Sequence, residues 1–159
     1  MEEAMNPETL AKLFELNKFC IKKNTEGLTH ADSLVQPQSS GNCFNWVLGH
    51  IVSTRNLILN LLGELPIWTE REAENYQRGS NPIEDGLQAH SFEKLLADFD
   101  RSQEQILNAL KRTSDEDLAQ KVDDETVGNE LATLYFHETY HVGQTGLLRR
   151  IAGKEGAIK

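Results

Sequence analysis

The sequence has few cysteines, no long apolar run and fewer basic than acidic residues, and each shortage excludes a class of protein. Its two cysteines, Cys20 and Cys43, form no C-x-x-C pair, so we expect small buried hydrophobic residues rather than a disulfide framework. No apolar run approaches the roughly 20 residues that a membrane span needs. The segment MEEAMNPETL lacks the basic flank and apolar stretch of a signal peptide. We therefore expect a cytoplasmic protein with no membrane partner.

Acidic residues outnumber basic ones, with 25 Asp and Glu against 16 Lys and Arg and a formal net charge of −9. Nucleic-acid binding needs clustered basic side chains, and the dense basic spots here are Lys22-Lys23 and Arg149-Arg150. We therefore expect no nucleic-acid partner. A chain of 159 residues favours a single domain over 1–159, large enough to form a core without a disulfide or a structural metal.

Apolar residues recur at helical spacing in four segments, and no segment alternates as a strand does, so the predicted fold class is all-α. Asn6 and Ser91 are candidate N-caps of the first and third helices, and Ser114 with Asp117 predicts one short additional turn before an acidic linker at 123–125. The four predicted helices run over about 7–29, 43–62, 91–112 and 126–152.

The stretch from Gly63 to His90 has no sustained period and is long for a loop in a helix bundle. A bundle with two consecutive helices running in the same direction requires such a crossover. We expect Ile67, Trp68 and Tyr76 to pin this segment to the bundle. The sequence therefore predicts a four-helix bundle with a long crossover between the second and third helices.

The segment His137-Glu-Thr-Tyr-His141 places two imidazoles four residues apart on the fourth predicted helix. They differ by about 40° around the helix axis and about 6 Å along it, so both can reach one metal ion. H-E-x-x-H is also the zinc-protease motif, with Glu138 as general base. No His follows His141, so the third-histidine extension of many such proteases is absent and the protease interpretation is the weaker one.

His50 is the candidate for a third ligand, because its position in the second predicted helix points it into the bundle. Gly49 beside it would allow close approach of a neighbouring helix. Polar residues interrupt all four apolar stripes at a similar height, namely Asn17, Asn24, Ser53, Thr54, Ser102, Gln103, His137, His141 and Gln144. Burying each unpaired would cost about 1–3 kcal/mol, so we expect them to share partners, water or an ion. The alternative is that His50 is an ordinary satisfied core histidine.

Three neutral imidazoles leave a coordination position open, which is typical of a catalytic metal site. Imidazole ligands suit a divalent transition metal, with zinc or nickel as first choices and copper, iron or manganese as others. Tyr140 and Gln144 could orient a ligand or a bound water, or simply pack. Three interpretations of Glu138 stay open, namely a general base, a supporting hydrogen-bond partner and a solvent-exposed residue. His30 and His90 are expected at the surface.

The segment Asn45-Trp-Val-Leu-Gly-His50, followed by His137-x-x-x-His141-Val-Gly-Gln144 and Leu147-Leu-Arg-Arg150, resembles the DinB/YfiT-like superfamily of small bacterial metalloproteins. The resemblance spans nearly the whole chain and rests on the order and spacing of the motifs. It implies that His50, His137 and His141 are the metal ligands. It also implies a four-helix bundle with up-up-down-down connectivity and a homodimer.

Members of this superfamily with known activity include thiol-dependent S-transferases that use bacillithiol or mycothiol, and a mycothiol-dependent isomerase. The resemblance therefore favours a metal-dependent enzyme that transfers a low-molecular-weight thiol to a small electrophile, with hydrolysis second. Asn17, Gln103, Tyr140 and Gln144 are candidates for positioning that small-molecule substrate. Ser53 and Thr54 stand where the group commonly has an Asp after the second-helix His. The alternative is a non-catalytic metal- or ligand-binding stress-response bundle.

Overall fold

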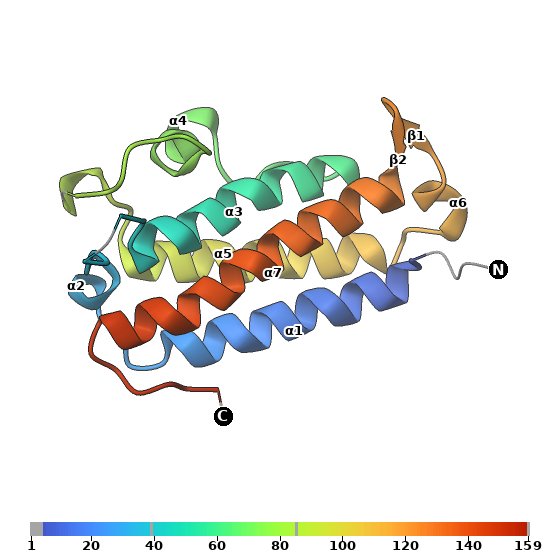
Figure 1. Ribbon diagram of the computed structural model, residues 1–159. Helices are drawn as coiled ribbons and strands as arrows, with labels where there is room; N and C mark the ends of the chain where they lie inside the picture. Colours follow the sequence, from blue (N-terminus) through green and yellow to red (C-terminus); the bar gives the residue numbers. More distant parts are fainter. Residues whose placement is uncertain (1–4, 39, 85, 159) are drawn as a thin grey trace.

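Four long helices dominate the computed structural model, which describes residues 5–38, 40–84 and 86–158 (Figure 1). They are α1 (Pro7–Thr25), α3 (Phe44–Leu61), α5 (Phe92–Leu110) and α7 (Val127–Ile151). Side chains of Asn6, Ser91 and Thr126 cap α1, α5 and α7 by accepting a hydrogen bond from the backbone N–H three residues on. The all-α class and the two predicted N-caps are confirmed.

The first helix ends at Thr25, about four residues earlier than predicted. Gly27 adopts a left-handed conformation with φ of 71°, which ends the helix, and Thr29 then begins a new one as N-cap. The short helices are α2 (His30–Ser33), α4 (Glu70–Ala73) and α6 (Asp115–Leu118), and each begins with a capping box. Short 3₁₀ turns cover Glu74–Tyr76 and Gly86–Gln88. Within the described ranges, no helix is long and apolar enough to cross a membrane.

A small hairpin occupies the predicted acidic linker, with β1 (Lys121–Val122) antiparallel to β2 (Glu125–Thr126). Asp123 in its turn has a positive φ of 54°, a conformation that Asp adopts more easily than most residues. The strands were not predicted, because two residues are too few to show an alternating pattern.

The helix directions differ from the up-up-down-down order that the resemblance implied. In Figure 1, α1 and α7 run one way, and α3 and α5 run the other. The connections from α1 to α3 and from α5 to α7 each turn back at one end of the bundle, so both reverse the chain. The described residues of the segment after α3, 63–84 and 86–90, instead return along the bundle, and so the predicted crossover between parallel helices is confirmed.

The buried apolar side chains form two clusters, one around Phe44, Leu48 and Phe99 and the other around Phe14 and Ile106. On each of the four long helices, buried polar residues lie between the positions that belong to one cluster and those that belong to the other. These residues are Asn17, Arg55, Ser102, Gln103 and Glu138. The bundle therefore has a polar centre between two apolar ends.

Most of the predicted core positions are buried, including Cys43 and the crossover residues Trp68 and Tyr76. Ile67 is partly buried against the same core. Leu147 and Ile151 are exposed, because the inward face of α7 carries Val142, Thr145 and Leu148. Cys20 is half-buried rather than buried.

Candidate metal centre

Three histidine side chains from two helices meet at one point beside the crossover. The Nε2 atom of His137 lies 3.3 Å from Nε2 of His50 and 3.2 Å from Nε2 of His141. Candidate ligand atoms of all three lie within 4.8 Å of one another. His137 and His141 are one turn apart on α7, whereas His50 is on α3, which packs antiparallel to it. The structure therefore brings together the three residues predicted as ligands.

The hydrogen bonds at the other ring nitrogens set the tautomers of two of these histidines. His50 Nδ1 lies 2.6 Å from the backbone oxygen of Tyr76, and His141 Nδ1 lies 2.8 Å from Oε1 of Gln144. Because both oxygens are acceptors, each Nδ1 donates a proton and each Nε2 keeps its lone pair. If His137 carried its proton on Nε2, that proton could form a hydrogen bond to Nε2 of His50 or to Nε2 of His141, but not to both at once. Converging, unprotonated nitrogens of this kind form the donor set of a metal site.

Two of the three nitrogen separations also fit a tetrahedral ion. Imidazole nitrogens bind zinc at about 2.0–2.1 Å, and two such ligands at the tetrahedral angle lie about 3.3 Å apart. The separations of 3.3 Å and 3.2 Å agree with that value. His137 Nδ1 is buried and has no hydrogen-bond partner, so no hydrogen bond at that nitrogen orients this third ring.

Burial keeps the three imidazoles neutral, which is the form that binds a metal. His50 is 6% exposed, and its ring stacks on the indole of Trp46 at a centroid distance of 4.7 Å. Desolvation lowers the pKa of His50 to about 4. Desolvation is also the main cause that lowers the pKa values of His137 and His141.

Gly49 lets the crossover reach His50. A Cβ atom at Gly49 would lie 2.1 Å from the ring of Tyr76, so a larger residue would displace that ring. The Tyr76 hydroxyl donates to Asn45 Oδ1 at 2.9 Å and accepts from the backbone N–H of His90 at 2.7 Å. The close approach predicted at Gly49 is present, but the approaching group belongs to the crossover and not to a helix of the bundle.

Gln144, Tyr140, His30 and His90, which were also singled out from the sequence, differ in how they contact their surroundings. Gln144 contacts His141 directly, as described above. Tyr140 is 61% exposed and sets its ring against that of His141 at 5.3 Å, so its role toward a ligand stays a prediction. His30 and His90 are half-buried, and the expectation of surface positions was wrong. His30 Nδ1 accepts from the backbone N–H of Phe92, and His90 stacks on Tyr76 at 5.2 Å.

Glu138 points into the bundle, where it forms an ion pair with Arg55. Arg55 Nε donates to Oε2 at 2.9 Å and Nη2 donates to Oε1 at 2.8 Å. Asn17 also donates to Oε1, at 3.2 Å. Glu138 is 2% exposed and Arg55 is 0% exposed, so the exposed interpretation of Glu138 is excluded. Its predicted catalytic role stays a prediction.

Sequence reasoning missed Arg55, although the signal was present. Arg55 occupies the place on the apolar stripe of its helix between Ile51 and Ile58. Glu138 likewise falls one heptad after Leu131. Opposite charges at core positions of two helices indicate a buried pair.

The polar residues of the bundle centre share hydrogen-bond partners, which is one of the outcomes expected of them, and the partners of Asn17, Asn24 and Gln103 are residues other than the three histidines. Asn17 bonds to Glu138 and Thr139, and Asn24 donates to Thr145 Oγ1 at 2.9 Å. Gln103 accepts from Arg55 at 2.8 Å. Because Asn17 and Gln103 are 3% and 0% exposed, they are not on a surface that a substrate could reach.

A cleft of about 730 Å³ opens beside His50 and His137. The crossover forms one wall, and α3 and α7 form the others. Its apolar lining consists of Leu57, Pro66, Trp68, Ala73 and Leu134, and its charged residues are Glu70 and Arg78. Clefts of about 300–1,000 Å³ hold small organic ligands. The histidine cluster therefore borders a space large enough for a small molecule.

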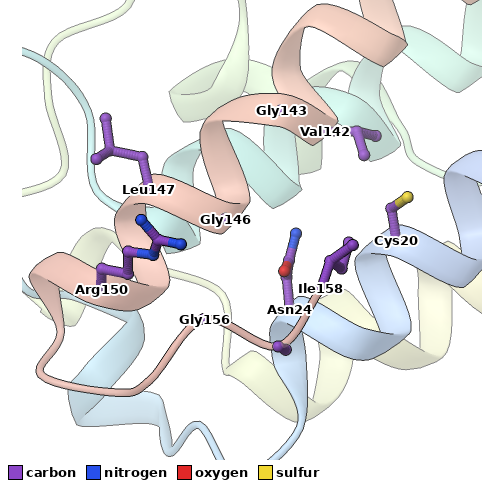
Figure 2. A pocket seen from close by; sticks show the side chains of 10 residues that line it. Cys20, Asn24, Val142, Gly143, Gly146, Leu147, Arg150, Gly156 and Ile158 are labelled. Carbon is purple, nitrogen blue, oxygen red and sulfur yellow. The ribbon is translucent and has the colours of Figure 1, made fainter.

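A second cavity of about 320 Å³ lies between α1 and α7, under residues 156–158 (Figure 2). Cys20 and Asn24 line it from α1, and Gly143, Gly146 and Arg150 line it from α7. None of the predicted catalytic or metal-binding residues lines this cavity.

Comparison with known proteins agrees with the geometry. A family model described as the DinB superfamily matches residues 22–145, a range that includes the three clustered histidines, the crossover and Arg55. A comparison with curated proteins found no match.

Proposed function

The chain belongs to the DinB superfamily, and from this premise we propose that it is a metal-dependent enzyme in which His50, His137 and His141 hold one divalent transition metal. The observation that carries the proposal is the convergence of three imidazole Nε2 atoms beside an open cleft. Zinc and nickel are the first choices, followed by iron or manganese, because neutral imidazole is a good ligand for late divalent ions.

We place the reaction in the class of thiol transfer to a small electrophile, with hydrolysis as the second choice. When bound, a divalent metal lowers the pKa of a thiol or a water and so supplies a nucleophile at neutral pH. The thiol sulfur forms a bond to the electrophilic carbon, a leaving group such as chloride departs with its bonding electron pair, and the thiol proton passes to solvent. The resemblance to thiol-dependent transferases favours the thiol, and the cleft supports a small acceptor.

The side chains around the histidines supply orientation and exclude water. The Tyr76 carbonyl and the Gln144 amide hold the protons of His50 and His141 at Nδ1, so both rings present Nε2 to the same point. Trp46 covers one face of His50 and keeps water from it. The apolar cleft wall offers a surface for the body of the electrophile. The homodimer expected from the resemblance stays a prediction.

Metal content and turnover test the proposal together. Protein purified without an affinity tag is loaded with zinc or nickel, and thiol conjugation to a chlorinated aromatic acceptor is followed. We expect about one ion per chain and metal-dependent product. His50→Ala loses both, whereas His30→Ala, which changes a histidine outside the cluster, keeps both.

The outcomes separate the alternatives. One bound ion without product under any metal loading would favour the non-catalytic metal-binding bundle. Absence of bound metal in the wild type would refute the metal site itself. Casein degradation that depends on Glu138 would favour the protease interpretation instead.

A further inference from the structure

The cleft beside the histidines contains one basic side chain, Arg78, among its lining residues. Arg78 lies in the crossover two positions after Tyr76, whose backbone oxygen bonds to His50. Within the described residues, no carboxylate or carbonyl pairs with the Arg78 guanidinium. Glu70 also lines the cleft but forms no ion pair with it. The cleft therefore presents a cation with unused donors next to the histidine cluster.

Apart from Glu70, the rest of the cleft wall is apolar or neutral. Leu57 is 55% exposed and lines the cleft, so it offers apolar surface to an occupant. Leu134 and Trp68 also line the cleft. An occupant that covers these groups has an apolar body, and it has room to place a polar end at Arg78.

The chemistry of a guanidinium limits which polar group the occupant can place at Arg78. Arg presents parallel N–H groups that match the two oxygens of a carboxylate, and such charge-assisted pairs are stronger than neutral hydrogen bonds. A neutral amide or hydroxyl would leave the positive charge of Arg78 without a counter-charge. The donor set at this end of the cleft therefore favours an anion.

We infer that the cleft takes a small amphipathic carboxylate, with its apolar part against Leu57 and Leu134 and its carboxylate on Arg78. The inference rests on the proposed function in that it takes this cleft as the substrate site. The carboxylate belongs either to the low-molecular-weight thiol or to the electrophile, and the experiment distinguishes the two. In both cases Arg78 determines which molecules bind.

Two matched pairs of probes test the inference, each comparing a carboxylate with its neutral amide. N-acetylcysteine and its amide stand for the thiol, and 3-phenylpropionate and its amide stand for the electrophile. Dissociation constants are measured by NMR titration on the protein as purified and after zinc loading. The variants are Arg78→Gln, the charge-conserving Arg78→Lys, and Arg71→Gln as a matched control. Arg71 is an exposed arginine of α4 that does not line the cleft.

We expect at least one carboxylate to bind roughly three- to tenfold more tightly than its amide, as a partly exposed charged pair allows. Arg78→Gln removes this preference, Arg78→Lys keeps part of it, and Arg71→Gln keeps all of it. The pair that shows the preference identifies whether the thiol or the electrophile carries the carboxylate.

Two results would overturn the inference. One is equal affinity for carboxylate and amide in both pairs. The other is a preference that Arg78→Gln leaves unchanged, which would mean that a group other than Arg78 binds the carboxylate. Failure of the proposed function would appear differently, as absence of bound metal or of product, while the preference would still be measurable on the protein as purified.

Discussion

Replacing Glu138 by Gln tests the buried ion pair that joins α7 to α3. Arg55 directs its N–H groups to two oxygens of Glu138 and to Phe99 O, Ser102 Oγ and Gln103 Oε1. Glutamine keeps the shape of the side chain but leaves the Arg55 cation buried without a counter-charge. Breaking one side of a buried ion pair costs about 3–5 kcal/mol. For a chain of this length that lowers Tm by about 6–20 °C.

The assay is guanidinium chloride unfolding followed by circular dichroism, with a chelator present so that metal binding does not add to stability. Glu15→Gln, an exposed carboxylate on α1, is the control and should stay within about 0.5 kcal/mol of the wild type. The double variant Arg55→Met with Glu138→Met should recover part of the loss, because it removes both charges. A loss below about 1 kcal/mol for Glu138→Gln would refute the buried, charged pair.

Three further predictions concern the metal centre and its support. Gln144→Leu should weaken metal affinity about tenfold in a chelator competition, since His141 loses its acceptor, and unchanged affinity would contradict that role. Gly49→Ala should destabilise the protein by about 1–3 kcal/mol in the same unfolding assay, because its Cβ meets Tyr76. Gly143→Ala, which meets nothing within 4 Å, should not destabilise it. The pKa of His50 is lowered from 6.5 to about 4, so below pH 6.5 the unfolded chain binds a proton that the folded chain does not. Metal-free protein should therefore lose up to about 3 kcal/mol as pH falls from about 6.5 to 4, and an identical pH profile for His50→Gln would show that this residue is not the cause.

The three histidines were predictable because their signals are local. Two histidines four residues apart face one side of any helix, and His50 lies among apolar residues that orient it inward. The N-caps Asn6 and Ser91 were predictable for the same reason, since a cap acts on the backbone three residues away.

The Arg55–Glu138 pair was missed because each helix was interpreted through its apolar stripe, so Arg55 was not considered and Glu138 was left without a partner. Only the packed structure shows that Arg55 and Glu138 each occupy a core position on their own helix and that these two positions face each other. The central polar residues were expected to share partners, water or an ion, and Asn17 and Gln103 share the Arg55–Glu138 pair as their partner. Asn17 and Gln103 could be assigned to a height along the bundle, but not to a partner.

The crossover carries functional groups that the sequence does not reveal. The acceptor for His50 is the backbone oxygen of Tyr76, and a backbone carbonyl is present at every residue. Its position depends on how Tyr76 packs on Gly49, which no periodic pattern encodes. The cleft wall around Arg78 depends on the same packing, so it became visible only in the structure.

Anomalous diffraction from crystals of zinc-loaded protein tests the central claim most directly. We predict one peak per chain, about 2.0–2.1 Å from the Nε2 atoms of His50, His137 and His141. A zinc peak elsewhere, or one bound by the α7 pair with His50 Nε2 more than about 3 Å away, would contradict it.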